Sequence, residues 1–168
     1  MLVARRAGEK RLAVLAGTLL LLAFVQILLG ALVAGIDAGR GYIDWPLMGG
    51  EWFPSEAFLL NPLWTNFFEN PALVQFIHRV MGYTVFGFGL YVWWRSRASA
   101  EVNTRAAFNA VALLLSAQVA LGIVTVLYAA PLSLGLAHQI GAVVLWVLII
   151  RARTHARAPV ARSIRGTR

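Results

Sequence analysis

Two histidines are the residues of this sequence best suited to hold a metal. His78 follows Pro71 by seven residues, and His138 follows Pro131 by the same number. Each proline opens an apolar run, and seven residues of helix span about 10 Å, so the two imidazoles are expected at one depth on different helices. The chain has no cysteine, and its apolar runs hold no carboxylate, so a zinc site with four protein ligands lacks donors. A haem iron needs only two axial ligands, and this pattern therefore favours a haem held by His78 and His138.

Two polar neighbours of His78 bear on this hypothesis. Arg79 lies well inside its apolar run, where it can pair with a haem propionate or extend its charged end to the headgroups. Gln75 lies one helical turn before His78, but an amide is a poor general acid or base. The residues thus predict a cofactor site that includes Arg79, with no identified catalytic group. Histidines that serve only packing remain an alternative.

The composition is that of a membrane protein. Of the 168 residues, 60% are hydrophobic and 13% are charged, and the mean hydropathy is +0.71. Soluble domains carry roughly 25% charged residues, so a soluble enzyme domain and a disordered chain are excluded. The absence of cysteine also excludes a disulfide framework, a cysteine nucleophile and haem attached through cysteine.

Four apolar runs are long enough to cross a bilayer, at about 28 Å or more each. They cover residues 12–36, 72–94, 106–128 and 132–150. Because backbone groups in lipid need internal partners, each run is expected to be a helix. The predicted fold is an all-α integral membrane protein, a bundle of four transmembrane helices with haem between its two helical hairpins.

The charges predict the orientation of this bundle. Arginine and lysine gather in segment 1–11, between the second and third runs, and in segment 151–168, whereas loop 37–71 holds five acidic residues against Arg40 alone. Positive residues mark the cytoplasmic side. We therefore expect a cytoplasmic segment 1–11, a membrane domain 12–150 with its outer loop 37–71, and a basic cytoplasmic tail 151–168. We expect the protein in a membrane, most simply the bacterial inner membrane, with the histidines toward the outer side. The net charge of +8 is then explained by topology and contact with lipid, and not by binding to nucleic acid.

The long outer loop holds eight of the nineteen aromatic residues of the chain. Loops of this length in a compact domain are usually functional or carry structure of their own. The aromatic side chains can form a belt at the headgroups or a lid over something bound at the outer end. The two interpretations are compatible.

The two halves of the chain repeat one pattern. Gln26-Ile-Leu-Leu-Gly30 in the first run corresponds to Gln118-Val-Ala-Leu-Gly122 in the third. His78-Arg-Val-Met-Gly82 in the second corresponds to His138-Gln-Ile-Gly141 in the fourth. Such hairpins are related by an axis along the membrane normal, which brings the histidines face to face. The glycines allow close approach of the helices or leave room for a flat porphyrin.

Several of these motifs together resemble the haem A synthase family, which has mitochondrial and bacterial members. They are Gly30-Ala-Leu-Val-Ala-Gly-Ile-Asp-Ala-Gly39, Trp45-Pro-Leu-Met48, Asn66-Phe-Phe-Glu-Asn-Pro71, Val74-Gln-Phe-Ile-His-Arg79, Gln118-Val-Ala-Leu-Gly122 and Ala137-His-Gln139. The resemblance runs from about residue 12 to residue 150, and the motifs are specific in this combination and order.

The resemblance implies a fold and a function. The family has eight helices in two four-helix halves and oxidises a methyl group of haem O to the formyl group of haem A, the cofactor of terminal cytochrome oxidases. This chain looks like the second half, which in the family holds a b-type haem through a histidine pair that corresponds to His78 and His138. The first half holds the substrate haem and a Glu-x-x-His motif, whose glutamate position is Gln75 here.

The resemblance leaves the state of the chain open. It can be a split protein paired with a separate first half, a piece of a longer gene product, or a free-standing four-helix cytochrome that pairs with a second copy. The expected function is the b-haem-binding half of a haem A synthase, which is an oxidoreductase. The isolated chain is not expected to catalyse the reaction by itself. The alternative is a free-standing b-type cytochrome or haem carrier without catalysis. A haem O synthase and an electron donor are further candidate partners.

Overall fold

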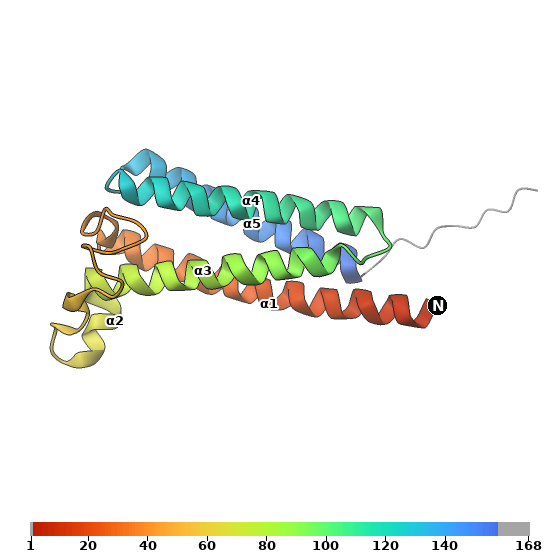
Figure 1. The fold of residues 1–168 in the computed structure, drawn as a ribbon, viewed down its shortest axis with the longest axis horizontal. Coiled ribbons are helices and arrows are strands. Elements are labelled where there is room, and N and C mark those ends of the chain that lie inside the picture. The colour runs from red at the N-terminus through yellow and green to blue at the C-terminus, as the bar shows by residue number, and fades with distance from the viewer. Residues whose placement is uncertain (1, 158–168) are drawn as a thin grey trace, which may run out of the picture.

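The computed structural model of this chain describes residues 2–157 and is all-helical over that range. Four long helices, α1 (Leu2–Gly35), α3 (Pro71–Ser96), α4 (Val102–Leu127) and α5 (Leu132–Arg157), lie side by side along the long axis of the molecule (Figure 1). Between α1 and α3 come three 3₁₀ turns and the one-turn helix α2 (Asn66–Glu69). Over residues 2–157 the only strand-like pairing is an isolated bridge between Met48 and Glu51. The 3₁₀ turns are η1 (Ala38–Arg40), η2 (Ser55–Phe58) and η3 (Leu63–Thr65).

The order of the helices around the bundle matters for the site. Helix α1 packs against α3 and α5, and α4 packs against the same two helices. This makes α3 and α5 diagonal neighbours across the bundle. The loop 37–71 and the short α4–α5 connection lie together at one end, here called the loop end (Figure 1).

Three of the helices are long and apolar enough to cross a membrane, over Glu9–Gly35, Val102–Leu127 and Leu132–Arg157. The prediction of an all-helical membrane protein is therefore confirmed. Helix α3 contains the predicted run 72–94 and has 26 residues, but it does not belong to this apolar group. Its Gln75, His78 and Arg79 lower its hydropathy, so the count of four spans stays a prediction.

The helices extend beyond the predicted runs at the end opposite the loop. Helix α1 continues through most of the predicted cytoplasmic segment 1–11, and α5 continues seven residues past Ile150, to Arg157. The rest of the predicted basic tail, 158–168, lies outside the described residues.

Small residues let the helices pack closely in this core. Ala16 and Ala152 are completely buried, and Gly89 of α3 faces Leu115 of α4 and Leu19 of α1. A β-carbon at Gly89 would collide with the Leu115 side chain. The largest buried core side chains are those of Phe108, Leu19, Ile149, Val74, Val92 and Val111.

We predict that Gly89→Leu destabilises the bundle by about 1–3 kcal/mol, because the new side chain overpacks a filled space. The midpoint of thermal unfolding in detergent measures this effect. Gly87→Leu is the matched control, since a β-carbon at Gly87 meets no atom within 4 Å. Equal midpoints for the two variants would contradict the packing described.

Candidate functional site

The two predicted histidines come from diagonal helices. His78 lies in the first third of α3 and His138 in the first third of α5, so both are near the loop end. Each imidazole is partly buried. The structure thus places the two residues on diagonal helices near the same end of the bundle.

Each imidazole fits against a glycine of the helix that precedes it in the chain. A β-carbon at Gly30 of α1 would lie 3.2 Å from Cε1 of His78, and one at Gly122 of α4 would lie 3.1 Å from Cε1 of His138. Such contacts are tighter than most side chains allow. The edge of an imidazole therefore fills the space at each of these two glycines. The glycines let the paired helices approach closely there, which is one of the two roles expected from the sequence.

The two repeated glutamines lie against the other two glycines of the pattern. A β-carbon at Gly82 would lie 3.3 Å from Nε2 of Gln26, and one at Gly141 would lie still closer to the amide of Gln118. Because the paired helices are antiparallel, the glutamine of one helix faces the glycine that follows the histidine on the other. The histidine in turn faces the glycine that follows the glutamine. The same reciprocal arrangement occurs in both hairpins.

Hydrogen bonding around the two imidazoles is incomplete. Gln26 Nε2 donates to the backbone oxygen of His78 at 3.1 Å and lies 3.2 Å from Nδ1 and 3.3 Å from Nε2 of the same ring. Within residues 2–157, Oε1 of Gln26, Oε1 of Gln118 and Nδ1 of His138 are buried without a hydrogen-bond partner. Buried polar groups normally find partners, so these three atoms leave hydrogen-bonding capacity unused beside the two imidazoles.

Arg79 faces the loop 37–71. Its Nη1 donates to the backbone oxygens of Asp44 at 2.9 Å and Leu47 at 2.8 Å, and its Nη2 donates to that of Tyr42 at 3.0 Å. Gln75 Nε2 donates to the same Tyr42 oxygen at 3.0 Å. Arg79 therefore fastens the loop to the helix that carries His78, and its predicted contact with a haem propionate stays a prediction.

A second polar cluster orders the remainder of the loop. Asn70 caps α3 by accepting from the backbone amide of Ala72 at 2.9 Å, and its own amide donates to Asn66 Oδ1 at 2.9 Å. Both asparagines are buried, and Asn66 also donates to the backbone oxygens of Leu60 and Leu63. Sequence reasoning assigned no role to either, although the proline after Asn70 and the preference of asparagine for N-caps were available as signals.

The aromatic side chains of the loop mostly face outward. Trp52 is 78% exposed and Trp64 is 62% exposed, while Phe53 packs edge-on against Phe76 of α3 with 4.9 Å between ring centroids. This arrangement favours the belt interpretation over a lid made of aromatic rings. The exposed members are Trp45, Trp52, Phe53, Phe58, Trp64, Phe67 and Phe68.

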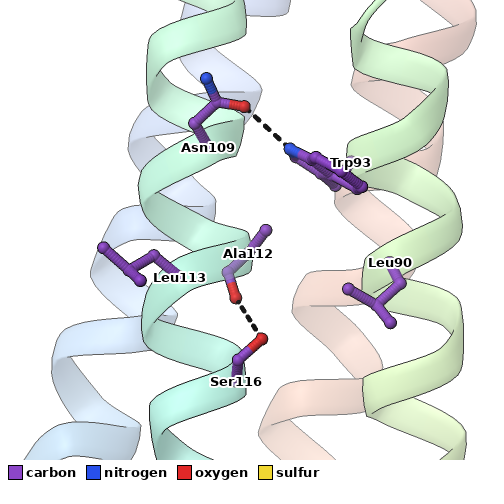
Figure 2. A pocket seen from close by; sticks show the side chains of 6 residues that line it. All are labelled: Leu90, Trp93, Asn109, Ala112, Leu113 and Ser116. Carbon is purple, nitrogen blue, oxygen red and sulfur yellow. Dashed lines mark hydrogen bonds between the residues drawn. The ribbon is translucent and has the colours of Figure 1, made fainter.

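Two hollows on the bundle surface lie away from His78 and His138. One groove between α3 and α4 is bridged by Trp93, whose Nε1 donates to Asn109 Oδ1 at 2.8 Å (Figure 2). Leu90, on its α3 wall, is about 18 Å along the helix from His78. Among the residues that the structure describes there is also no group of three or more histidines, cysteines or carboxylates that could hold an ion. The pair His78 and His138 offers two imidazoles as protein ligands.

Comparison with known proteins decides the family. The model of the COX15-CtaA family, described as cytochrome oxidase assembly protein, matches residues 2–150. The chain belongs to this family. The resemblance to haem A synthases is likewise confirmed, since it is 59% identical to the haem A synthase of Paracoccus denitrificans over 167 residues and 60% identical to that of Dinoroseobacter shibae over 166 residues.

The chain spans less than half the length of these relatives. Both alignments include 99% of this chain, but they include only 44% of the Paracoccus protein and 43% of the Dinoroseobacter protein. The haem A synthase of Ruegeria sp. (strain TM1040) gives the same proportion, with 58% identity over 44% of its length. No solved structure gives a significant match to the chain.

We predict that Arg79→Met releases the loop. The variant keeps the length of the side chain but loses three hydrogen bonds, and bonds from a charged group contribute about 1.5–3 kcal/mol each. Amide hydrogen exchange across residues 42–51 should accelerate at least about tenfold. Arg40→Met is the control, because Arg40 makes only an exposed contact with Asp37 at 3.7 Å. Unchanged exchange in Arg79→Met would show that the loop holds its conformation without this residue.

Tyr42 provides a pH-dependent test of the same loop. Burial raises the pKa of Tyr42 to about 12, helped by its hydrogen bond to Glu56 at 2.9 Å and by the charges of Glu56, Glu51 and Asp44. Because the folded pKa exceeds the ordinary value of 10, the associated stability is fully present below pH 10 and is lost as the pH rises toward 12.

We predict that Glu56→Gln lowers the pKa of Tyr42 toward its ordinary value, since the charge that opposes the phenolate is removed. Ultraviolet titration of phenolate absorbance, taken as the difference from Tyr42→Phe, measures this pKa. Glu69→Gln serves as the control, because Glu69 takes no part in the shift. A pKa still near 12 in Glu56→Gln would rule out this carboxylate as a cause.

Proposed function

We propose that this chain forms the b-haem-binding half of a haem A synthase, with His78 and His138 as the two axial ligands. The observation that carries the proposal is the histidine pair on diagonal helices, each imidazole set against a glycine at the same level of the bundle. Membership of the COX15-CtaA family and identity of 58–60% to three haem A synthases support it independently.

The donor set fits a haem. Two imidazoles from opposite sides are what an iron with four porphyrin nitrogens still needs, and the absence of cysteine in the chain suits a haem held without covalent attachment. The buried and unpartnered Nδ1 of His138 indicates an imidazole arranged for something besides internal packing. When bound, a b-type haem would supply one-electron transfer, with its potential set by the axial ligands and by burial.

The residues of the chain would then divide the work. His78 and His138 would hold the iron, and the apolar bundle would exclude water from it. Arg79 would fasten loop 37–71 over the helix of His78 and would present its remaining guanidinium edge to a propionate. The apolar runs hold no carboxylate, so the oxidation of haem O to haem A would fall to a first-half polypeptide. A second copy of this chain could complete the two-half arrangement but would lack the carboxylate as well.

The proposal includes the placement in the membrane. All four long helices would cross the bilayer, α3 being shielded by its neighbours α1 and α4. The excess of arginine and lysine away from loop 37–71 would keep both termini in the cytoplasm and the histidines toward the outer side.

The test is a reduced-minus-oxidised optical spectrum of the detergent-purified chain. We expect the wild type to show a low-spin b-type haem, and His78→Ala and His138→Ala each to lose it, because one remaining ligand cannot hold the low-spin state. His155→Ala is the control, since this third histidine lies 17 residues beyond His138. Retention of the full spectrum in both ligand variants would overturn the assignment.

Co-expression separates a missing partner from a wrong function. If the chain alone is folded and colourless, it is produced together with the part of the Paracoccus denitrificans haem A synthase that it does not match. Haem content and formyl haem are then measured, with haem O and an electron source supplied. A folded, assembled pair without haem at the histidines would refute the proposal.

A further inference from the structure

We propose that Gln26 and Gln118 are positioning residues for the two histidines. Each glutamine carbonyl oxygen would accept the Nδ1–H of the imidazole on its paired helix and leave Nε2 free for a ligand. Gln26 would hold His78, and Gln118 would hold His138. This inference deepens the proposed function and rests on it where the ligand is a haem.

In the first hairpin the glutamine already contacts the ring. Gln26 Nε2 donates to the backbone oxygen of His78 at 3.1 Å, which fixes the amide against α3, and it lies 3.2 Å from Nδ1. Oε1 belongs to the same amide and is buried without a partner. In the structure the amide nitrogen faces the ring, 3.2 Å from Nδ1 and 3.3 Å from Nε2. Exchanging the two ends of the amide would give up its bond to the backbone oxygen and bring the free Oε1, an acceptor, to Nδ1.

In the second hairpin both partners of the expected bond are unpaired. Gln118 lies against Gly141, one turn after His138, and His138 lies against Gly122, one turn after Gln118. Within the described part of the chain, Oε1 of Gln118 and Nδ1 of His138 are each buried and unpartnered. A neutral imidazole can carry its proton on Nδ1, so a bond between the two groups would satisfy both at once.

A hydrogen bond of this kind changes what the imidazole can do. A ligating histidine almost always donates its second ring N–H to an acceptor, which fixes the tautomer and ring orientation and makes the ligand more basic. Inside a membrane no water replaces a missing acceptor. The amide oxygens of Gln26 and Gln118 are the acceptors that the repeat places one turn from each histidine.

The glycines distinguish this role from plain packing. Gly82 and Gly141 each leave room for a glutamine amide that any larger residue would displace. Methionine fills nearly the same volume as glutamine but has no carbonyl oxygen, so it keeps the packing and removes the acceptor. Glutamate keeps both the shape and an acceptor oxygen.

The first arm of the test uses the haem-loaded protein. In Gln26→Met and Gln118→Met we expect haem retention to fall about tenfold, the midpoint potential of the remaining haem to rise, and its electron paramagnetic resonance g-values to shift. Gln118→Glu should restore retention. Gln139→Met is the matched control, because Gln139 adjoins His138 in the chain but has an exposed side chain. Unchanged potential and g-values in the methionine variants would overturn the proposal.

The second arm needs no haem. Nitrogen-15 resonances of His138 in the haem-free chain should report a proton on Nδ1 in the wild type and a change of tautomer in Gln118→Met. If these resonances move but the wild type binds no haem, the positioning role stands and the haem function falls. If they do not move, the positioning role is overturned whether or not haem binds.

Discussion

The close approach of antiparallel helices at glycine is the constraint on which this structure depends. Polar side chains inside an apolar bundle need room, and each hairpin provides it by setting a glycine opposite one glutamine and one histidine. Gly30 receives the edge of His78, and Gly122 receives that of His138. A β-carbon at either position would force the imidazole to move by a few tenths of an ångström, so the glycines help to set where each ring lies.

The two hairpins keep this arrangement and differ at the loop end. Arg79 follows His78, whereas Gln139 follows His138. The arginine binds three backbone oxygens of a long loop, and the exposed glutamine accompanies a connection of only a few residues between α4 and α5. The two hairpins thus differ where one carries a long loop and a cation that holds it, while each histidine lies in the first third of its helix.

Periodicity and spacing predicted the long helices, the repeat and the matched level of the histidines, because these follow from rise per residue and from the position of proline. The contacts of Gly30 and Gly82 could not be predicted, since spacing does not determine how a helix is rotated toward its neighbours. Arg79 illustrates the same limit. Its propionate interpretation considered an anionic partner, while the folded loop supplies carbonyl oxygens whose direction depends on turns that no short motif specifies.

The loop has two faces, one directed outward and the other directed toward the helix that carries His78. Its indole and phenyl rings point outward, with Trp52 and Trp64 largely exposed, and rings of this kind prefer the membrane interface. Its backbone oxygens at Tyr42, Asp44 and Leu47 turn inward to Arg79. Because Arg79 adjoins His78 on a continuous helix, the depth at which the rings rest and the depth of the imidazole are mechanically linked. Without Arg79 the loop would be released from α3, while the packing of α3 on α1 and the bond from Gln26 to the His78 backbone oxygen would still hold His78 against Gly30.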